Sequence, residues 1–272
     1  MRLLEQMKLF RGLVVAGIVV GVILPLLPIL INAFGTRWFF PDLLPQAFSL
    51  RGWEYVLNPQ ARVLQAAFTS LFIALTVTFL CAILGIPAGR ALATAGRRTK
   101  PFLEFMVLAP LVVPGLAVLM GVQITFIRLG LSDTVAGVII AHLLPSLPYM
   151  ILVLSGVFAN FDKEYELQAR TLGASGVSVF FHVTLPSIRP GLVAGGLFVF
   201  LISWTQYILT LLVGGGRVLT IPVLLFSFAT SGDRTLTAVL STIFLLPPIL
   251  ILVFTGKYLS GRSKALTGLG NI

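Results

Sequence analysis

Charged residues are scarce in this sequence. Only 10% of its 272 residues are Asp, Glu, Lys or Arg, whereas 57% are hydrophobic and the mean hydropathy is +1.03. A soluble domain usually carries about a quarter charged residues, so this chain cannot cover a soluble surface. Apolar runs of about 20 residues recur along it without alternating, which disfavours a β-barrel. The composition therefore predicts an all-α, polytopic membrane protein.

Cysteine, histidine and enzyme motifs are scarce as well. The single cysteine, Cys81, lies inside an apolar run, which excludes a disulfide framework and is typical of a small buried residue. The two histidines are 40 positions apart, and the sequence contains neither HExxH nor a GxxxxGKS or GxxxxGKT phosphate loop. We therefore expect no catalytic residue, no metal site and no cofactor in the chain itself. For His142 we expect a packed or hydrogen-bonded interior position, and for His182 a solvated or hydrogen-bonded one.

Six apolar spans are predicted within a single transmembrane domain that covers residues 1–272. They are 10–33, 64–89, 102–123, 134–158, 191–213 and 236–257. The first has the basic start of a signal peptide but a longer apolar run, so we expect an uncleaved helix. Prolines interrupt the third span at 110 and 114 and the fourth at 145 and 148. Because proline frees backbone carbonyls, these helices either line an interior surface or kink for packing.

The net charge of +10 raises the question of a nucleic-acid partner, but its distribution favours a membrane. If the N-terminus is cytoplasmic, the six spans place most of the 19 Lys and Arg residues on the cytoplasmic side, as the positive-inside rule requires. The basic excess then meets anionic lipid headgroups, and no nucleic acid is needed. We therefore predict that both termini and the segment 160–190 face the cytoplasm.

The fifth span carries polar residues in its middle. Ser203, Gln206, Tyr207 and Thr210 are spaced i, i+3, i+4 and i+7, which places them on one face of a continuous helix. Such a face either lines a translocation pathway or bonds one helix to another. No span has Asp, Lys or Arg at mid-depth, where ion-coupled carriers usually keep ionisable groups. This weakens the alternative of a secondary carrier or channel.

The most polar stretch is residues 160–190, which lies between two apolar spans. Its pattern predicts a helix from Glu164 to Arg170, which Gly173 ends in the left-handed conformation. Ser175 should cap a second short helix that reaches about His182. A polar helical loop inside a membrane protein of this composition indicates a partner in water.

Two prolines and several apolar residues complete this stretch. Pro186 and Pro190 are expected to close the loop, and Pro190 to begin the next membrane helix. Leu172, Val177, Phe180 and Phe181 are too apolar for a freely solvated loop. Two short helices with apolar and charged faces are typical of a docking element, and the alternative is a hairpin lying on the bilayer surface.

The segment LQARTLGASGVSVFFHVTLPSIRPG resembles the EAA loop of the membrane subunits of bacterial ABC importers, whose pattern is EAA, then a glycine, then LP. Leu167, Gln168 and Ala169 stand at the EAA positions, Gly173 at the glycine and Leu185-Pro186 at the LP. Leu167 and Gln168 depart from the pattern, and a glutamate stands one position early. The segments PLVVPGLAVLMGVQITFIRLGLSDTVAGVIIAHLLPSLPYMI and WTQYILTLLVGGGRVLTIPVLLF resemble permeases for spermidine/putrescine, ferric iron, thiamine and 2-aminoethylphosphonate.

The resemblance implies a type I permease fold with six transmembrane helices and cytoplasmic coupling helices in the bacterial inner membrane. It implies three partners: a cytoplasmic ABC ATPase dimer that binds ATP and Mg, a second permease subunit, identical or homologous, and a periplasmic substrate-binding protein. The solute would be small and polar, with a polyamine favoured and 2-aminoethylphosphonate, thiamine or ferric iron as alternatives. The residues expected to couple to the ATPase are Glu166, Ala169, Arg170, Leu172, Gly173, Ala174 and Pro186.

Overall fold

The computed structural model describes residues 12–267, apart from 15–16, 18, 22, 37, 39–41, 43 and 114. Five helices among the described residues are long and apolar enough to cross a membrane. They are Gly12–Phe34, which runs across undescribed positions, Val63–Thr94, Val135–Ala159, Gly176–Trp204 and Arg234–Gly256. The predicted helical membrane class is confirmed. The first two residues of the predicted span 10–33 lie outside the described residues.

The chain divides into two compact units. The first contains residues up to 64 together with 224–247, and the second contains 65–223 together with the residues from 248 onward. The elements that begin in the first unit are α2 (Leu26–Phe34), β1 (Gly35–Thr36), β2 (Ala47–Phe48), α3 (Arg51–Leu57), η1 (Pro59–Ala61), α4 (Val63–Thr94) and α13 (Arg234–Thr267). Those that begin in the second are α5 (Lys100–Val112), α6 (Gly115–Arg128), α7 (Val135–Ala159), α8 (Glu164–Thr171), α9 (Gly176–Val179), the π-helical turn η2 (Phe180–Thr184), α10 (Leu185–Trp204), α11 (Ile208–Gly214) and α12 (Ile221–Ser231).

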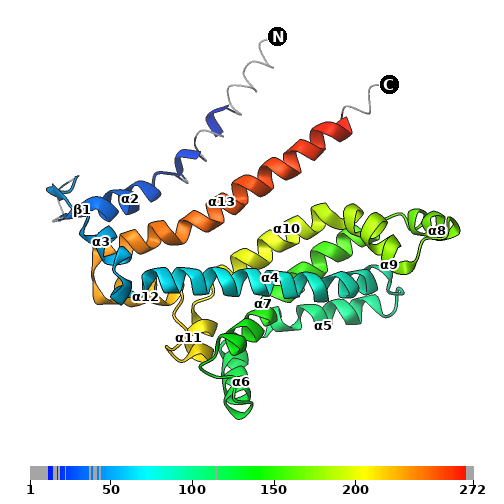
Figure 1. Cartoon of the computed structure of the whole chain (residues 1–272), viewed down its shortest axis with the longest axis horizontal. Coiled ribbons are helices and arrows are strands. Elements are labelled where there is room, and N and C mark those ends of the chain that lie inside the picture. The colour runs from blue at the N-terminus through cyan, green and yellow to red at the C-terminus, as the bar shows by residue number, and fades with distance from the viewer. Residues whose placement is uncertain are drawn as a thin grey trace, which may run out of the picture. The chain divides into compact units, whose positions relative to one another are not determined.

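The third predicted span, 102–123, is wrong as one continuous helix. It is divided between α5, which ends at Val112, and α6, which begins at Gly115. Val113 adopts an extended conformation with φ −69° and ψ 136°. The reason is that the residue before a proline is pushed away from the helical region, and residue 114 is proline. The axis of α6 therefore turns away from that of α5 (Figure 1).

The fifth predicted span, 191–213, also differs from the structure. α10 begins at Leu185, directly after η2, and ends at Trp204. The chain is not helical at Thr205 to Tyr207 and becomes helical again at the start of α11. The backbone N–H and the Oγ1 of Thr205 both donate to the carbonyl oxygen of Leu201, at 3.1 Å and 2.9 Å, and complete the last turn of α10.

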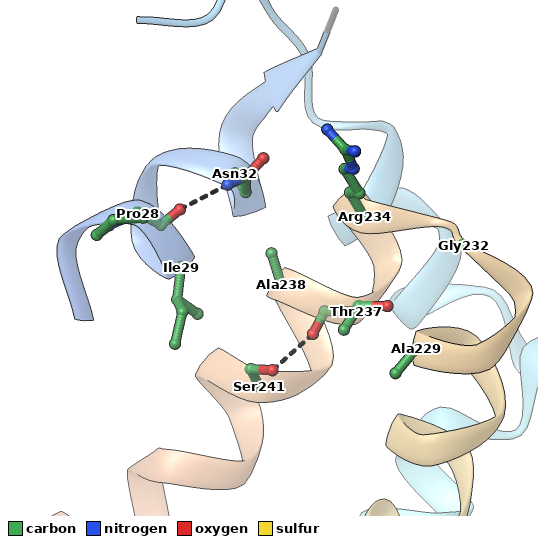
Figure 2. Close-up of a pocket in the computed structure, with 9 residues that line it drawn as sticks. All are labelled: Pro28, Ile29, Asn32, Ala229, Gly232, Arg234, Thr237, Ala238 and Ser241. Carbon is green, nitrogen blue, oxygen red and sulfur yellow. Dashed lines mark hydrogen bonds between the residues drawn. The ribbon is translucent and has the colours of Figure 1, made fainter. Parts of the chain in front are cut away.

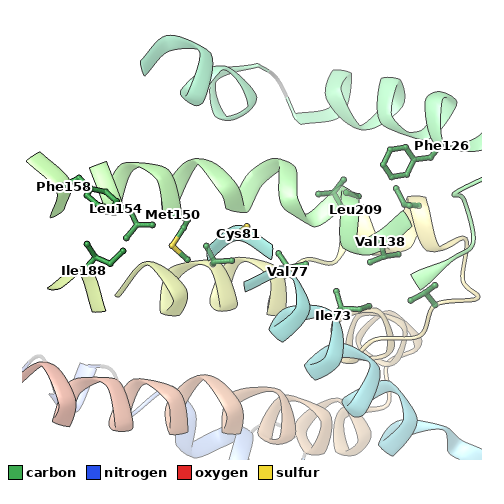
Figure 3. Close-up of a cluster of buried hydrophobic side chains, with 14 residues drawn as sticks. Ile73, Val77, Cys81, Phe126, Val138, Met150, Leu154, Phe158, Ile188 and Leu209 are labelled. Carbon is green, nitrogen blue, oxygen red and sulfur yellow. The ribbon is translucent and has the colours of Figure 1, made fainter. Parts of the chain in front are cut away.

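The hydrophobic core of the second unit lies where α4, α7 and α10 pack together (Figure 3). Val77 and Cys81 of α4, Met150 and Leu154 of α7, and Ile188 of α10 are fully buried there. The burial of Cys81 confirms the prediction for it. Close packing of α4 on α7 depends on glycine at position 89, since an added Cβ would lie 2.8 Å from Leu154 Cβ.

Candidate functional site

The segment 160–190 folds into a helical hairpin at one end of the second unit (Figure 1). α8 covers the predicted helix, and Gly173 follows it with φ +88°, in the region where glycine avoids the clash of a side chain. Ser175 then caps α9, because its Oγ accepts from the backbone N–H of Ser178 at 3.3 Å. The first helix, the glycine turn and the serine cap are confirmed. The second helix begins where predicted, but its predicted end near His182 is wrong, because the chain stays helical from Gly176 to Trp204.

The predicted roles of Pro186 and Pro190 are wrong. The chain stays helical from Gly176 through η2 into α10, so Pro186 lies in the first turn of α10 and Pro190 lies inside that helix. A proline ring clashes with the carbonyl four residues earlier in a regular helix. The π-helical turn ends at Thr184 and contains the carbonyl of His182, four residues before Pro186, so the wider turn accommodates Pro186.

Glu166 is buried and clamps three elements together. Its carboxylate accepts from Arg90 of α4 through both oxygens, at 2.9 Å and 2.6 Å, and from Thr184 Oγ1 of η2 at 2.6 Å. The guanidinium of Arg90 also lies 5.9 Å from the ring centre of Phe158, at the end of α7. The hydrogen bonds from Arg90 outweigh the effect of burial and hold the pKa of the Glu166 carboxyl below its ordinary value of 4.5. We call Arg90, Glu166 and Thr184 the clamp.

The lowered pKa of Glu166 gives the clamp a defined pH dependence. A carboxyl with a depressed pKa in the folded state stabilises the fold above its ordinary pKa, and this contribution is lost as the pH falls through the lowered value. We therefore expect the hydrogen-exchange protection of α8, corrected for intrinsic exchange, to be constant down to pH 4.5 and to fall below it. Glu166→Gln should remove this fall. Protection that already declines above pH 4.5 in the wild type would contradict the assignment.

The hairpin exposes several large apolar side chains. Leu172 is 89% exposed and Val177 is 69% exposed, on either side of the Gly173 turn. With Tyr165, Leu167 and Phe181, which are also exposed, they form what we call the hairpin face. Of the residues predicted to couple to an ATPase, Arg170, Leu172, Gly173 and Pro186 are exposed, Ala169 and Ala174 are half-buried, and Glu166 is buried. The structure thus turns the Glu166 carboxylate inward, where a partner cannot reach it.

The polar residues of the fifth span do not share one helix face, because the helix is interrupted between them. Ser203 and Thr210 are buried and lie 2.9 Å from Nδ1 and Nε2 of His142, respectively. This confirms the interior, hydrogen-bonded position predicted for His142. Tyr207 and Gln206 are half-buried. Gln206 lines a cavity of about 220 Å³. The other lining residues are Pro110, Leu119, Leu144, Pro145, Ile208 and Leu209.

A second depression, of about 400 Å³, lies in the first unit between α2, α12 and α13 (Figure 2). Its polar groups are mostly engaged locally: Asn32 Nδ2 donates to the carbonyl oxygen of Pro28 at 2.9 Å, and Ser241 Oγ donates to that of Thr237 at 2.8 Å. Arg234 is the one charged residue of its lining. Within the described part of the chain, no group of three or more His, Cys, Asp or Glu side chains could hold a metal ion.

Residues 83–264 match the family described as the binding-protein-dependent transport system inner membrane component. The chain belongs to this family. The permease is 30% identical over 226 residues to the putrescine transport system permease protein PotI of Escherichia coli, which covers 80% of this chain and 79% of that protein. It is 32% identical over 179 residues to the molybdenum transport system permease protein ModB of Mycobacterium tuberculosis, which covers 61% and 67% of the two chains.

Two solved structures have the same fold. The permease superposes on a subunit of a bacterial ABC transporter involved in the import of the acidic polysaccharide alginate, with a TM-score of 0.69 and 15% identity over 93% of this chain and 96% of that one. For the MetNI methionine ABC transporter the TM-score is 0.56, with 14% identity over 73% and 94%. These findings confirm the type I permease fold. The protein is a multi-pass inner-membrane permease subunit of an ABC importer, and such subunits carry no ATPase site.

Sequence reasoning missed the partners of Glu166 and of His142 in the permease. Arg90 is separated from Glu166 by 76 positions. From the sequence, Arg90 is only one of the basic residues that indicate which side of the membrane a loop faces. Thr184 lies 18 positions from Glu166, across the glycine turn. No local pattern in the sequence pairs these residues, because the pairing depends on how α4 packs against the hairpin.

Proposed function

We propose that the permease docks a cytoplasmic ABC ATPase with the hairpin face. The observation that carries this proposal is the exposure of Leu172 and Val177 on an otherwise polar segment. Exposed large apolar side chains on a segment in water indicate a protein interface, since burial against a partner removes their surface from water. The short helices of the hairpin are rigidly held by the clamp and by the Ser175 cap, which suits a surface that must transmit force.

The mechanism follows from this docking. Two permease subunits, identical or homologous, would form the pathway, and a periplasmic binding protein would deliver the solute to it. ATP and Mg would be bound by the partner ATPase dimer, whose closure moves the hairpin. Since the helix is continuous from Gly176 to Trp204, that movement would reach the non-helical segment that follows Trp204. We place Gln206 in the pathway together with Tyr207, while Ser203 and Thr210 hold this region to α7.

Affinity purification of the intact complex tests this function. The tagged permease, extracted in mild detergent, should retain an ATPase that hydrolyses ATP and a second permease subunit. Reconstituted with its binding protein, the complex should take up solute only with ATP inside. A permease that transports as a purified single chain without an ATPase would instead be a secondary carrier or channel. Reporter fusions at both termini test the proposed cytoplasmic orientation, which rests on the distribution of Lys and Arg.

For the solute we propose a small polar molecule, with a polyamine as the first candidate. PotI, and the spermidine/putrescine permease PotC of Escherichia coli, which is 23% identical over 261 residues, support this choice. The relative ModB carries the name of an oxyanion system, so molybdate joins 2-aminoethylphosphonate, thiamine and ferric iron as a competitor. Calorimetric binding of each compound to the partner binding protein decides between them. Tight binding of an oxyanion and none of putrescine or spermidine would overturn the polyamine proposal.

The glycine turn of the hairpin yields a prediction for coupling. A Cβ at Gly173 would meet no atom within 4 Å, so the space for a side chain there is open in the permease alone. Gly173→Asn should therefore keep the positive φ at small cost, because asparagine tolerates it, while adding bulk at the docking surface. We expect normal membrane insertion and ATP hydrolysis that no longer drives uptake.

Gly232→Asn is the matched control for this substitution. Gly232 has a similar φ of +81° and equally open surroundings, but lies in the first unit, on the side predicted to face the periplasm. Uptake per ATP hydrolysed, measured in proteoliposomes, should fall for Gly173→Asn and stay at the wild-type value for Gly232→Asn. If Gly173→Asn kept the wild-type uptake per ATP hydrolysed, the proposal that the ATPase closely approaches the Gly173 turn would be contradicted.

A further inference from the structure

His142 bridges the two sides of an interrupted membrane helix. Its Nδ1 lies 2.9 Å from Ser203 Oγ, before the interruption, and its Nε2 lies 2.9 Å from Thr210 Oγ1, after it. All three side chains are buried, and His142 itself is only 1% exposed. α7 thus holds the end of α10 and the beginning of α11 through one imidazole ring.

The hydrogen-bond network fixes how the protons are shared. Thr210 Oγ1 donates to the carbonyl oxygen of Gln206 at 2.8 Å. A threonine hydroxyl has a single proton, so Thr210 must accept from His142, which places the ring proton on Nε2. Burial far from water favours the neutral form of the imidazole. In that form Nδ1 is an acceptor and Ser203 donates to it, so both ring nitrogens are satisfied without any buried charge.

This bridge determines where Gln206 lies. The carbonyl of Gln206 is tied to Thr210, and its side chain lines the cavity of about 220 Å³. Leu144 and Pro145, which follow His142 on α7, line the same cavity. Gln206 is the one residue of the lining with a polar side chain. A non-helical segment at membrane depth is tolerated only where it is buried in protein or lines an aqueous cavity, and the cavity beside Gln206 meets this condition.

We propose that His142 is a positioning residue that holds residues 205–207 against this cavity in one state of the transport cycle, and that the bridge opens to let the segment move in the other state. The proposal rests on the proposed function for the cycle itself. Breaking two neutral hydrogen bonds while the polar groups re-pair costs little, because a typical bond contributes about 1 kcal/mol net. A charged bridge would resist opening far more strongly.

The test follows a cysteine at position 206. Gln206→Cys is introduced together with Cys81→Ala in the complete complex. ATP-driven uptake is demonstrated for that complex first. A negative labelling result then cannot be caused by a missing ATPase. A water-soluble methanethiosulfonate reagent is applied without nucleotide and after trapping with ATP and vanadate. We expect labelling rates that differ about tenfold between the two conditions, a size typical of allosteric coupling. Equal rates at Gln206→Cys, repeated at Tyr207→Cys, would overturn movement of the segment.

The role of His142 is tested on the same background. His142→Phe keeps a ring but removes both hydrogen bonds, and Thr210→Val removes the acceptor with little change of shape. Both should reduce the difference in labelling to less than about twofold, while His142→Gln, which keeps one donor and one acceptor, should largely restore it. Ser70→Ala is the control, because it removes another buried hydrogen bond, to the backbone N–H of Ile221 at 2.8 Å. A full difference in both His142→Phe and Thr210→Val would overturn the assignment.

Discussion

Arg90→Gln is expected to leave the permease in the membrane and bound to its ATPase, but to abolish most ATP-driven uptake. The substitution leaves the Glu166 carboxylate buried, with the hydrogen bond from Thr184 as its remaining described contact. Breaking a buried ion pair costs roughly 3–5 kcal/mol, and we expect about 2 kcal/mol here because the Arg90 side chain is 41% exposed and water screens it. The hairpin should therefore stay folded while its attachment to α4 loosens.

The measurement is uptake per ATP hydrolysed in proteoliposomes, together with retention of the ATPase during purification. Arg90→Lys should give an intermediate value, because an ammonium group cannot bind both carboxylate oxygens as the guanidinium does. Arg97→Gln is the matched control, since Arg97 is exposed and has no ion pair among the described residues. In a double-mutant cycle, Arg90→Gln and Glu166→Gln should be strongly non-additive. Additive effects, or wild-type coupling in Arg90→Gln, would show that the clamp does not transmit movement.

Leu172→Glu should detach the ATPase from the permease. The side chain is 89% exposed in the permease alone, so the substitution removes almost no internal packing and should not alter insertion or stability. At a docked interface it would bury a charge without a partner. The central apolar residue of an interface typically contributes at least about 2 kcal/mol, which corresponds to roughly 30-fold in affinity.

The affinity is measured with detergent-solubilised permease and purified ATPase by microscale thermophoresis. Leu129→Glu serves as the control, because Leu129 is also strongly exposed, at 65%, but lies in the loop after α6, on the side predicted to be periplasmic. Its affinity for the ATPase should equal that of the wild type. If Leu172→Glu bound as tightly as Leu129→Glu, the hairpin face would be a lipid-facing surface rather than a docking site.

The parts of the permease that could be predicted from sequence are those governed by local chemistry. The helix α8, the left-handed glycine after it and the serine cap of α9 each depend on residues within a few positions of one another. The sequence predicts contact of Glu166 with a partner from its adjacency to the EAA positions. In the structure its carboxylate binds Arg90, on a helix distant in sequence.

The errors along the membrane spans have a single physical origin. Helical periodicity was applied across positions where the backbone departs from the helix, at Val113 and at Thr205 to Tyr207. Conversely, the sequence predicts boundaries at Pro186 and Pro190, although the helix continues through both positions. Hydropathy detects apolar length but not hydrogen-bond continuity, so it cannot distinguish one long helix from two shorter ones.

One unbroken helical run, from Gly176 to Trp204, contains the second arm of the hairpin and all of α10. Its 29 residues span about 43 Å at the rise of an α-helix. A tilt of about 5° about its Gly176 end would therefore displace Trp204 by about 4 Å. A small rotation near the hairpin would thus become a displacement of about three quarters of the pitch of a helical turn where the chain leaves α10. The amplification follows from the length of the helical run.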